Sequence, residues 1–501
     1  MSERPVERGF VELARRDKLE ALRGRGVPPF AYRFARSHTA AGALAAFAEG
    51  QEGPAVAVAG RLVAIRTHGK TLFAHLADAS GRIQLYFRRD DLGGELFDVL
   101  GLLDLGDHVG AAGALFRTRT GEVTLKVERF ELLAKALRPL PLGKTAAGVD
   151  GSEAHFSELA DPEQRYRQRY ADLAVHAEHR ALFEQRAAVV RAVRRFLDAR
   201  GFLEVETPIL QPLYGGASAR PFVTRYNALG TEFYLRIADE LYLKRLIVGG
   251  CERVYEIGKD FRNEGMDRLH NPEFTMLESY EAYVDYMDVL EMTQSLVVEV
   301  VREVTGGLVV EAGGKPVDLT PPWRRAGFSE LVLEHAGVDL KRSDAAALAA
   351  ELARRGIAPD QSAGRGRLID QLFKAAVEPK LDAPVFILDF PIEMSPLAKP
   401  KRGDPELAER FELFVGGYEL ANAFSELNDP DDQRRRFEAQ GVLRAGGDEE
   451  AQALDEDYLR ALEYGLPPTG GMGLGIDRLT MLVTGARTIR DVILFPALRP
   501  E

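Results

Sequence analysis

Hydrophobic and polar positions alternate in five short runs in the first third of the chain. The runs span residues 55–66, 71–77, 82–88, 107–117 and 122–132, with glycines between or beside them. Such alternation is typical of β-strands that bury one face. Five short strands in succession predict a small closed barrel, with the OB-fold as the leading candidate. Residues 1–23 have the pattern of an amphipathic helix that precedes the barrel.

The same alternation indicates which side chains point away from the barrel core. Phe73 and His75 fall between the apolar positions of one strand, Gln84 and Tyr86 between those of the next, and Glu122 lies outside the apolar set of the last. Aromatic rings beside an amide suit the stacking and edge-reading of unpaired bases. The alternative is a hydrophobic contact with a neighbouring domain, because lone exposed aromatic residues are ordinary.

The rest of the chain mixes strand and helix patterns. A Pro/Gly-rich junction at 137–153 predicts a domain boundary. A helix is expected up to Gly201, followed by a strand in "FLEVETPIL" that ends at Pro208. Strands are predicted at 253–262, 272–280, 385–390 and 412–415, and helices near 240–249, 284–304, 344–355 and 365–378. Glycine-rich βαβ signals are missing, so an α+β fold with a central antiparallel sheet flanked by helices is expected.

Composition narrows the class of protein. The chain has 501 residues, enough for about three domains. Cys251 is the only cysteine, which excludes intramolecular disulfides and multi-cysteine zinc sites and predicts a reducing, cytoplasmic compartment. No apolar stretch reaches the roughly 18 residues of a membrane helix, so no membrane association is expected. The net charge of −12 argues against wholesale non-specific binding of nucleic acid, although a local patch could still read one.

Two neighbouring stretches, "FRNEG" at 261–265 and "HNPEFTMLESY" at 270–280, carry the first candidate chemistry. Side chains two residues apart share a face of a strand. Arg262 and Glu264 are therefore expected on one face, as is the alternating set Phe274, Met276, Glu278 and Tyr280. The prediction is a surface with one arginine, an aromatic ring and carboxylates.

A glycine ladder stands near the C-terminus in "GGMGLGIDRLTML". Gly471, Gly473 and Gly475 alternate, so all three are expected on one side of a strand, where the missing Cβ atoms allow a flat ligand to approach. Arg478 is expected in the first turn of the following helix. The alternative is a strand that merely packs beneath a helix.

Residues 410–429 add two acids on a predicted hairpin. If Gly416-Gly417 form its turn, Glu412 lies opposite Ala421 and becomes a diagonal neighbour of Glu419. Two such carboxylates favour a cation between them, and hard oxygen ligands suit Mg²⁺ bridging to phosphates. The alternative is a solvated charged face. Strict alternation places Asn422, Phe424 and Glu426 on the other face, so a shared site predicts an irregularity near 421–423.

Three stretches together resemble the signature motifs of class II aminoacyl-tRNA synthetases. "RGFLEVETPIL" (motif 1, near 200–210) contains the hallmark Pro208, "FRNEG…HNPEFTMLE" matches motif 2 near 261–280, and "GMGLGIDRL" matches motif 3 near 470–484. The N-terminal barrel is similar to that of the aspartyl, asparaginyl and lysyl subgroup. Stretches such as "ALRPLPLGK", "RYRQRYADL", "GGASARPF" and "FSELNDPDDQ" resemble the bacterial lysyl-tRNA synthetase family over nearly the whole chain. Ser218, Tyr418 and Ala423 depart from the family pattern.

This resemblance implies an organisation and an activity. It implies a helix plus OB-fold anticodon-binding domain at 1–140, a linker at 141–165, and a class II catalytic domain at 166–501 with a helical insertion near 340–380. The implied reaction joins L-lysine to ATP as lysyl-adenylate and transfers lysine to the 3′ end of tRNA(Lys). A cytoplasmic homodimer with its two-fold interface around 180–210 is expected.

The resemblance also implies residue roles. Arg262 and Arg478 are the expected catalytic residues, and Glu412 and Glu419 the expected Mg²⁺ ligands. The expected ATP-binding residues are Arg262, Glu264, His270, Phe274, Glu412, Glu419, Gly475 and Arg478. The expected lysine-binding residues are Gly216, Glu240, Arg262, Glu278, Tyr280, Asn422, Phe424 and Glu426. Phe73, Gln84 and Glu122 are expected to contact the tRNA anticodon.

Other activities compete with this reading. An aspartate or asparagine enzyme would offer different charges at the end of the pocket, and a tRNA-independent lysine ligase acting on proteins would lack the barrel. A catalytically inactive nucleic-acid binder would not need Arg262, Glu412, Glu419 and Arg478 together.

Overall fold

The computed structural model describes residues 9–49, 53–147, 153–360, 364–445 and 453–500. The chain divides into two compact units, Met1–Ala160 and Asp161–Glu501.

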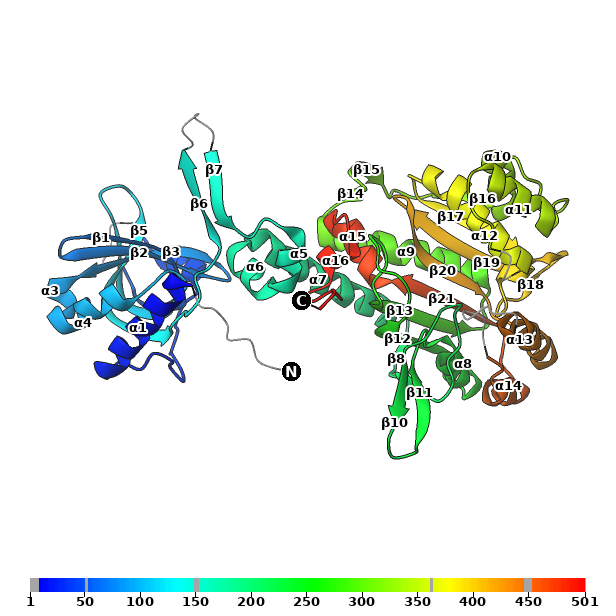
Figure 1. Cartoon of the computed structure of the whole chain (residues 1–501), viewed down its shortest axis with the longest axis horizontal. Coiled ribbons are helices and arrows are strands. Elements are labelled where there is room, and N and C mark those ends of the chain that lie inside the picture. Colours follow the sequence, from blue (N-terminus) through cyan, green and yellow to red (C-terminus); the bar gives the residue numbers. More distant parts are fainter. Residues whose placement is uncertain (1–8, 50–52, 148–152, 361–363, 446–452, 501) are drawn as a thin grey trace. The chain divides into compact units, whose positions relative to one another are not determined.

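The N-terminal unit contains the closed barrel that the alternating runs predict. Its strands are β1 (Ala55–His68), β2 (Thr71–Asp78), β3 (Gly81–Arg88), β4 (His108–Arg117) and β5 (Val123–Ala134), joined in the order β1-β2-β3-β5-β4 and back to β1 (Figure 1). The apolar positions of the runs fill the barrel, which confirms the assignment of its faces. The unit also contains α1 (Phe10–Gly24), α2 (Ala40–Ala46), α3 (Arg89–Leu92), α4 (Gly94–Val99) and the 3-10 turn η1 (Leu100–Leu102).

A β-hairpin occupies much of the segment that the sequence predicts as a linker. Its strands are β6 (Leu142–Ala147) and β7 (Glu153–Glu158), which pair antiparallel. The division between the two units falls just after this hairpin.

The C-terminal unit is built on a large mixed sheet. The order is β16 (Arg324–Gly327), β17 (Val385–Pro391), β19 (Asp404–Val415), β20 (Tyr418–Ser425), β21 (Thr469–Gly475), β13 (Glu273–Ala282), β12 (Arg253–Phe261) and β8 (Leu203–Glu204), with β18 (Pro400–Lys401) paired to β19 (Figure 1). The central pairs are antiparallel, as the sequence predicts, whereas β16–β17 and β12–β8 are parallel. The predicted central antiparallel sheet is therefore confirmed, and its two end pairs are parallel.

Helices cover the sheet and leave part of one face open. The helices α7 (Ala177–Asp198), α9 (Tyr286–Thr305) and α15 (Ile476–Thr484) pack into one apolar core with β12, β13 and β19–β21. In Figure 1, α9 runs behind β19–β21. A second core joins α10 (Phe328–Ala336), α11 (Ala345–Arg354) and α12 (Gly364–Ala376) to β17, and a third joins α8 (Glu240–Val248) to α14 (Glu456–Glu463) and Phe437 of α13 (Pro430–Ala445). Within the described ranges, no helix combines the length and apolar character that a bilayer crossing requires.

The remaining elements are short. They are α5 (Pro162–Arg167), α6 (Arg169–Val175), α16 (Ile489–Val492), η2 (Glu378–Lys380), η3 (Ile392–Met394), β14 (Val309–Ala312) with β15 (Lys315–Asp318), and the small sheet of β9 (Leu210–Gln211), β11 (Thr231–Leu235) and β10 (Val223–Tyr226).

The strand predicted for "FLEVETPIL" is wrong over most of its length. Only the two residues of β8 and, separately, the two of β9 pair in sheets. Between them, Thr207 donates hydrogen bonds from its backbone N–H and its hydroxyl to buried Glu256, at 3.0 and 2.7 Å. Pro208 has no N–H to donate. The segment therefore satisfies its donors through a side chain instead of a ladder.

The prediction that "FRNEG" continues a strand is also wrong. β12 ends at Phe261, and Arg262 and Glu264 lie in the loop that follows. The Arg262 N–H still donates to the Pro272 carbonyl at 2.9 Å, but proline cannot return the bond, so the ladder stops there. The N–H of Asn263 then donates a hydrogen bond to the Arg220 carbonyl at 2.8 Å.

Candidate active site

A cavity of about 670 Å³ opens on the face of the large sheet that the helices leave free. Glu412 excepted, every residue that the sequence assigns to the amino acid or ATP lines it: Gly216, Glu240, Arg262, Glu264, His270, Phe274, Glu278, Tyr280, Glu419, Asn422, Phe424, Glu426, Gly475 and Arg478. Residues from segments more than 200 positions apart in sequence thus share one hollow, and the two loop residues 262 and 264 reach it without being part of a strand.

The glycine ladder forms the floor of the cavity. Gly471 pairs with Tyr280 of β13 on one side and Phe424 of β20 on the other, and Gly473 pairs with Glu278 and Asn422. A Cβ on Gly471 would lie 2.0 Å from the Glu426 Oε1, so glycine is required there. A Cβ on Gly473 would meet nothing closer than 3.8 Å. The space above Gly473, beside Glu278, is therefore free of protein atoms at that distance.

The irregularity predicted in the second hairpin strand is present, one residue earlier than expected. Phe414 pairs with Glu419, but Leu413 pairs with Ala421, so Leu420 is the extra residue of a bulge. The bulge turns Glu419 and Asn422 to the same side, and both line the cavity. The predicted pairing of Glu412 with Ala421 is therefore wrong: Glu412 lies opposite Asn422.

Two arginines, Arg262 and Arg478, line one end of the cavity. The Arg262 guanidinium lies 5.1 Å from the centre of the Phe274 ring, which stands half-buried at the start of β13. Arg478 is in the first turn of α15 as predicted, and it donates to the Glu419 carbonyl at 2.7 Å. Its other nitrogen lies 3.1 Å from the His270 Nε2.

Glu412 is not among the residues that line the cavity, but its carboxyl group is close enough to Glu419 for the charge of Glu419 to act on it. Burial and the charge of Glu419 raise the pKa of Glu412 to about 8, although Arg410 opposes this shift. Arg410 pairs with Glu412 at 2.6 Å, and Arg478 pairs with Glu419 at 3.4 Å. Two carboxylates that repel each other form a hard-oxygen donor set, which fits Mg²⁺.

The opposite end of the cavity is lined by acids. Glu240 begins α8, beside Gly216, whose positive φ of 89° leaves no room for a side chain against Ala238. Glu240 and Glu426 both form ion pairs with the ammonium of Lys244, which is fully buried. Burial alone would lower the pKa of Lys244, but the two carboxylates outweigh it and raise the pKa.

Glu278 belongs to a second acidic group at this end. Its Oε2 accepts a hydrogen bond from the Tyr280 hydroxyl at 2.7 Å, and a ligand oxygen of Asp239 and one of Asp260 lie within 4.8 Å of it. Burial raises the pKa of Glu278 to about 8, and Glu240 and Asp260 add to the shift. Asp260 pairs with buried Arg236, whereas the Asp239 oxygens accept no hydrogen bond from the described residues. The group is short of positive charge.

Sequence reasoning missed several cations of this site. Arg410 lines the cavity and donates to the Asn422 Oδ1 at 3.0 Å; its position two residues before Glu412 on the same strand face was the available signal. Lys244 lies one helical turn after Glu240, which also could have indicated the contact. Arg367 and Lys374 of α12 line the cavity, so the helical insertion contributes to the site. No local pattern pointed to these two.

The outer face of the barrel gathers the residues predicted for base recognition. Phe73 pairs with Tyr86 across β2 and β3, with ring centres 4.8 Å apart, and Phe116 follows at 5.8 Å from Tyr86. Gln84 donates to Glu122 at 2.7 Å, and His75 contacts the other Glu122 oxygen at 3.0 Å. Gln84, His75 and Glu122 are at least partly exposed and hydrogen-bonded through Glu122. The face therefore presents aromatic rings beside polar groups that solvent reaches.

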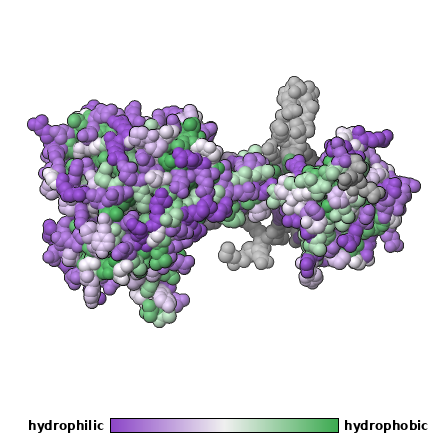
Figure 2. All heavy atoms as spheres, turned by 180° about the vertical axis from the view of Figure 1, so that it is seen from behind, coloured by the Kyte–Doolittle hydropathy of each residue, from purple (hydrophilic) through white to green (hydrophobic). Residues whose placement is uncertain are grey.

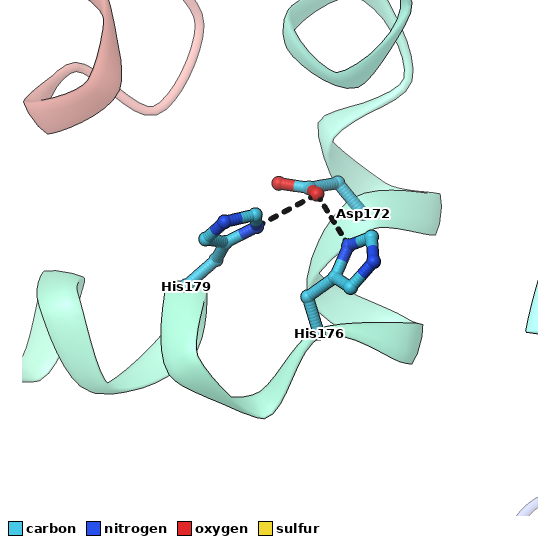
Figure 3. Close-up of side chains that lie close together, drawn as sticks. All are labelled: Asp172, His176 and His179. Atoms are coloured by element: carbon cyan, nitrogen blue, oxygen red, sulfur yellow. Dashed lines mark hydrogen bonds and ion pairs between the residues drawn. The ribbon is translucent and has the colours of Figure 1, made fainter. Parts of the chain in front are cut away.

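A cluster of Asp172, His176 and His179 has the composition of a metal site but lies outside the cavity (Figure 3). One Asp172 oxygen accepts from the Nδ1 atoms of both histidines at 2.8 Å, and the other accepts from Arg169 at 2.7 Å. Burial opposes ionisation of Asp172, but hydrogen bonds from His176 and Arg169 outweigh it and lower the pKa. Because all of these hydrogen bonds come from protein side chains, we interpret the Asp172 carboxylate as a structural link between α6 and α7.

Comparison with known proteins identifies the family of each unit. Residues 161–499 match the family model "tRNA synthetases class II (D, K and N)", and residues 56–133 match "OB-fold nucleic acid binding domain". Similar relatives include the lysine–tRNA ligases of Pelotomaculum thermopropionicum (51% identical; 97% of this chain, 94% of the relative), Moorella thermoacetica (51%; 97% of both) and Syntrophomonas wolfei (50%; 100% and 99%). The chain belongs to the class II tRNA synthetases and, within them, to the lysine–tRNA ligase family.

Proposed function

We propose that the cavity forms lysyl-adenylate from L-lysine and ATP, and that the barrel binds the anticodon of tRNA(Lys). The reaction of a lysine–tRNA ligase follows from membership of the family. The assignment of each step to a residue rests on one observation above all: Arg262 and the carboxylates of Glu240, Glu278 and Glu426 line the same cavity.

At the nucleotide end, the residues bind and orient phosphate. Arg262 bridges the lysine carboxylate and the α-phosphate, because a planar guanidinium can serve two anions at once. Phe274 stacks under adenine and Arg478 covers it, while Glu264 and His270 contact the ends of the nucleotide. Glu412 and Glu419 hold Mg²⁺, which neutralises charge on the polyphosphate when bound. Gly475 lets the nucleotide lie against the strand.

At the amino-acid end, the residues select a cationic side chain. Glu240 and the Gly216 backbone hold the α-amino group, and Glu278, Tyr280 and Glu426 surround the far ammonium. Asn422 and Phe424 line the aliphatic stem. A buried acidic pocket left without its ammonium is heavily penalised, so neutral amino acids are rejected. Ornithine differs by one methylene, worth about 1–3 kcal/mol, and is the hardest competitor.

The chemical step needs no side chain as general acid or base. The lysine carboxylate is already a nucleophile, and it attacks the α-phosphorus in line as the bond to pyrophosphate breaks. The chain contributes orientation and charge: Arg262 brings the two anions together, and Arg478 holds the nucleotide still. A hydroxyl of the terminal ribose of tRNA then attacks the carbonyl carbon of the adenylate, an ester bond forms and AMP leaves.

On the barrel, Phe73 stacks on a base of the anticodon, while Gln84 and Glu122 read neighbouring edges. Stacking on an exposed ring and hydrogen bonds to base edges are the usual means of reading single-stranded loops. The contact between Gln84 and Glu122 orients both groups before the tRNA arrives.

A homodimer and a cytoplasmic location complete the proposal. Around 203–229, the large apolar residues Leu203, Leu210, Val223, Tyr226 and Leu229 are exposed. Green atoms are visible on the hairpin that projects at the lower edge of Figure 2. Exposed apolar surface of this kind marks a protein interface. Light scattering should give twice the chain mass of 55.3 kDa.

Exchange of pyrophosphate into ATP tests the catalytic proposal. Exchange should depend on lysine, proceed weakly with ornithine, and be absent with aspartate and asparagine. Exchange that responds to aspartate, or to no amino acid, would overturn the lysine assignment. Aminoacylation of tRNA(Lys) then tests the role of the barrel separately.

A further inference from the structure

The amino-acid end of the cavity already contains an ammonium of the protein itself. The Lys244 Nζ forms ion pairs with Glu240 and Glu426, and it lies 5.2 Å from the centre of the Phe424 ring and 5.9 Å from that of Tyr280. These four residues are assigned to lysine binding in the proposed function. Lys244 thus has the surroundings that the substrate side chain is proposed to have.

Lys244 and the substrate approach these acids from different sides. Glu240, Glu426, Tyr280 and Phe424 all line the cavity, whereas Lys244 does not and its side chain has no exposed surface. Its stem comes from α8, one turn after Glu240. The carboxylates therefore lie between a resident ammonium inside the protein and the space that a ligand enters.

The net charge of Glu240, Glu426 and Lys244 favours binding of one more cation. Lys244 supplies one positive charge to two carboxylates, so the three groups together carry one negative charge when ionised. Without Lys244, two bare acids would face each other in a buried place, and such acids take up protons or move apart. Gly471 leaves room for this carboxylate, because a Cβ at that position would lie 2.0 Å from the Glu426 Oε1.

We propose that Lys244 is a positioning residue for substrate specificity: its buried ammonium favours the charged forms of Glu240 and Glu426 and holds both carboxylates in place, so that the cavity accepts one further ammonium. This inference rests on the proposed function. The role of Lys244 is through the two acids, since it does not reach the cavity.

The first test compares three side chains at position 244 by lysine-dependent ATP–pyrophosphate exchange. K244M keeps the length of the stem and removes the charge; it should raise the KM for lysine about 100-fold, because breaking a buried ion pair leaves an uncompensated charge. K244R keeps a cation and should lie between wild type and K244M. A structural role by packing alone would favour Met over the bulkier Arg, so K244M performing as well as K244R would overturn the proposal.

The KM for ATP and the rise in melting temperature on adding ATP report whether each variant is folded. Both should stay close to wild type, because Lys244 belongs to the amino-acid end of the cavity. Equal loss at the lysine and ATP ends would mean general disruption and would also overturn the proposal. A K244M protein that does not fold while K244R folds and binds lysine supports the need for the charge.

Chemical rescue separates charge from volume. K244A removes the atoms that n-propylammonium would replace, and 1-propanol has similar size without charge. Propylammonium should restore much of the lysine-dependent exchange, and 1-propanol should not. Equal rescue by both, or by neither with a folded protein, would count against the proposal.

A matched control comes from the N-terminal unit. Lys135 is also fully buried and also pairs with two carboxylates, those of Asp104 and Asp107. K135M removes the same kind of buried ammonium from a place with no proposed role in lysine activation, so lysine exchange should not change. If wild type itself shows no exchange with lysine, the proposed function is wrong. If wild type exchanges with lysine but the Lys244 variants do not show the expected rise in KM, only the proposed role of Lys244 is wrong.

Discussion

The two binding surfaces hold their polar groups in opposite ways. On the barrel, Gln84, Glu122 and His75 are part-exposed and bond mainly to one another. In the cavity, Glu278 and Glu426 are buried, and burial raises the pKa of both. A group in water loses little when its partner disappears, whereas a buried charge without a partner is costly. Substitutions in the cavity should therefore reduce activity far more than substitutions on the barrel face.

Replacing Arg262 with alanine should have the largest effect. We expect lysine-dependent exchange to fall by about 1000-fold or more, because the proposed role of Arg262 is to supply charge that stabilises the transition state. The melting temperature should change little, since the side chain makes one long hydrogen bond of 3.4 Å to the Ile237 carbonyl.

R253A is the matched control for this variant. Arg253 begins the same strand, β12, and pairs with Glu281 at the far end from Arg262. Its exchange rate should equal that of wild type. Near-normal exchange by R262A would remove the main support for the nucleotide end of the site.

Replacing Phe73 with alanine should have a smaller effect, confined to tRNA. Loss of one stacked base costs about 1–3 kcal/mol, so the KM for tRNA(Lys) should rise roughly tenfold to 100-fold. Exchange without tRNA should be unchanged. The control is Y32A, which removes a fully exposed aromatic residue from the same unit. Equal losses in charging and exchange by F73A would contradict the division of labour between the two surfaces.

Adding a single methyl group to the cavity floor should sharpen the contrast further. In G473A the new Cβ meets no protein atom closer than 3.8 Å, so the free protein should keep its melting temperature. The methyl would occupy ligand space, and we expect the KM for lysine or ATP to rise about tenfold by analogy with lost packing complementarity. A G473A enzyme with unchanged KM values would mean that ligands do not use this floor.

The pH dependence of lysine binding should show the smallest effect. Below about pH 8 Glu278 holds a proton in the empty protein, and an arriving ammonium favours its release. The KM for lysine should fall roughly tenfold from pH 7 to 8.5. Calorimetry in buffers of different ionisation enthalpy should detect the released proton, and E278Q should abolish it.

The same raised pKa has a consequence for folding, with a definite sign. The native state binds this proton between pH 4.5 and about 8, whereas the unfolded state does not. Glu278 therefore lowers the free energy of unfolding as pH rises through that window. Denaturation of ligand-free wild type and E278Q should differ in this slope, and identical slopes would count against the assigned pKa.

Much of this fold could be predicted because local patterns were in agreement with tertiary structure. The five alternating runs set both the barrel strands and their core faces, and the alternating residues from Phe274 to Tyr280 all line the cavity. The predictions failed where a side chain replaced backbone pairing, as Glu256 does at Thr207, or where Pro272 ended a ladder. Neither event leaves a periodic signal.

The candidate site was predictable in its acids and less so in its cations. Glu240, Glu278 and Glu426 came from the family pattern, but Lys244, Arg410 and the α12 side chains did not. Their importance depends on which elements pack together, and a single sequence does not show that. The two parallel strand pairs at the sheet ends were missed for the same reason, since both join segments distant in sequence.

The bulge at Leu420 fixes how far apart the cavity-lining side chains of β20 lie. Glu419 stands before it and Asn422 and Phe424 after it, all on one side. The distance between the proposed phosphate-binding side chain and the proposed lysine-binding side chains is thus set by the backbone of one strand. Deleting Leu420 would remove the bulge and make Glu419 and Asn422 next-but-one neighbours, so both would stay on one face while the distance between them changed.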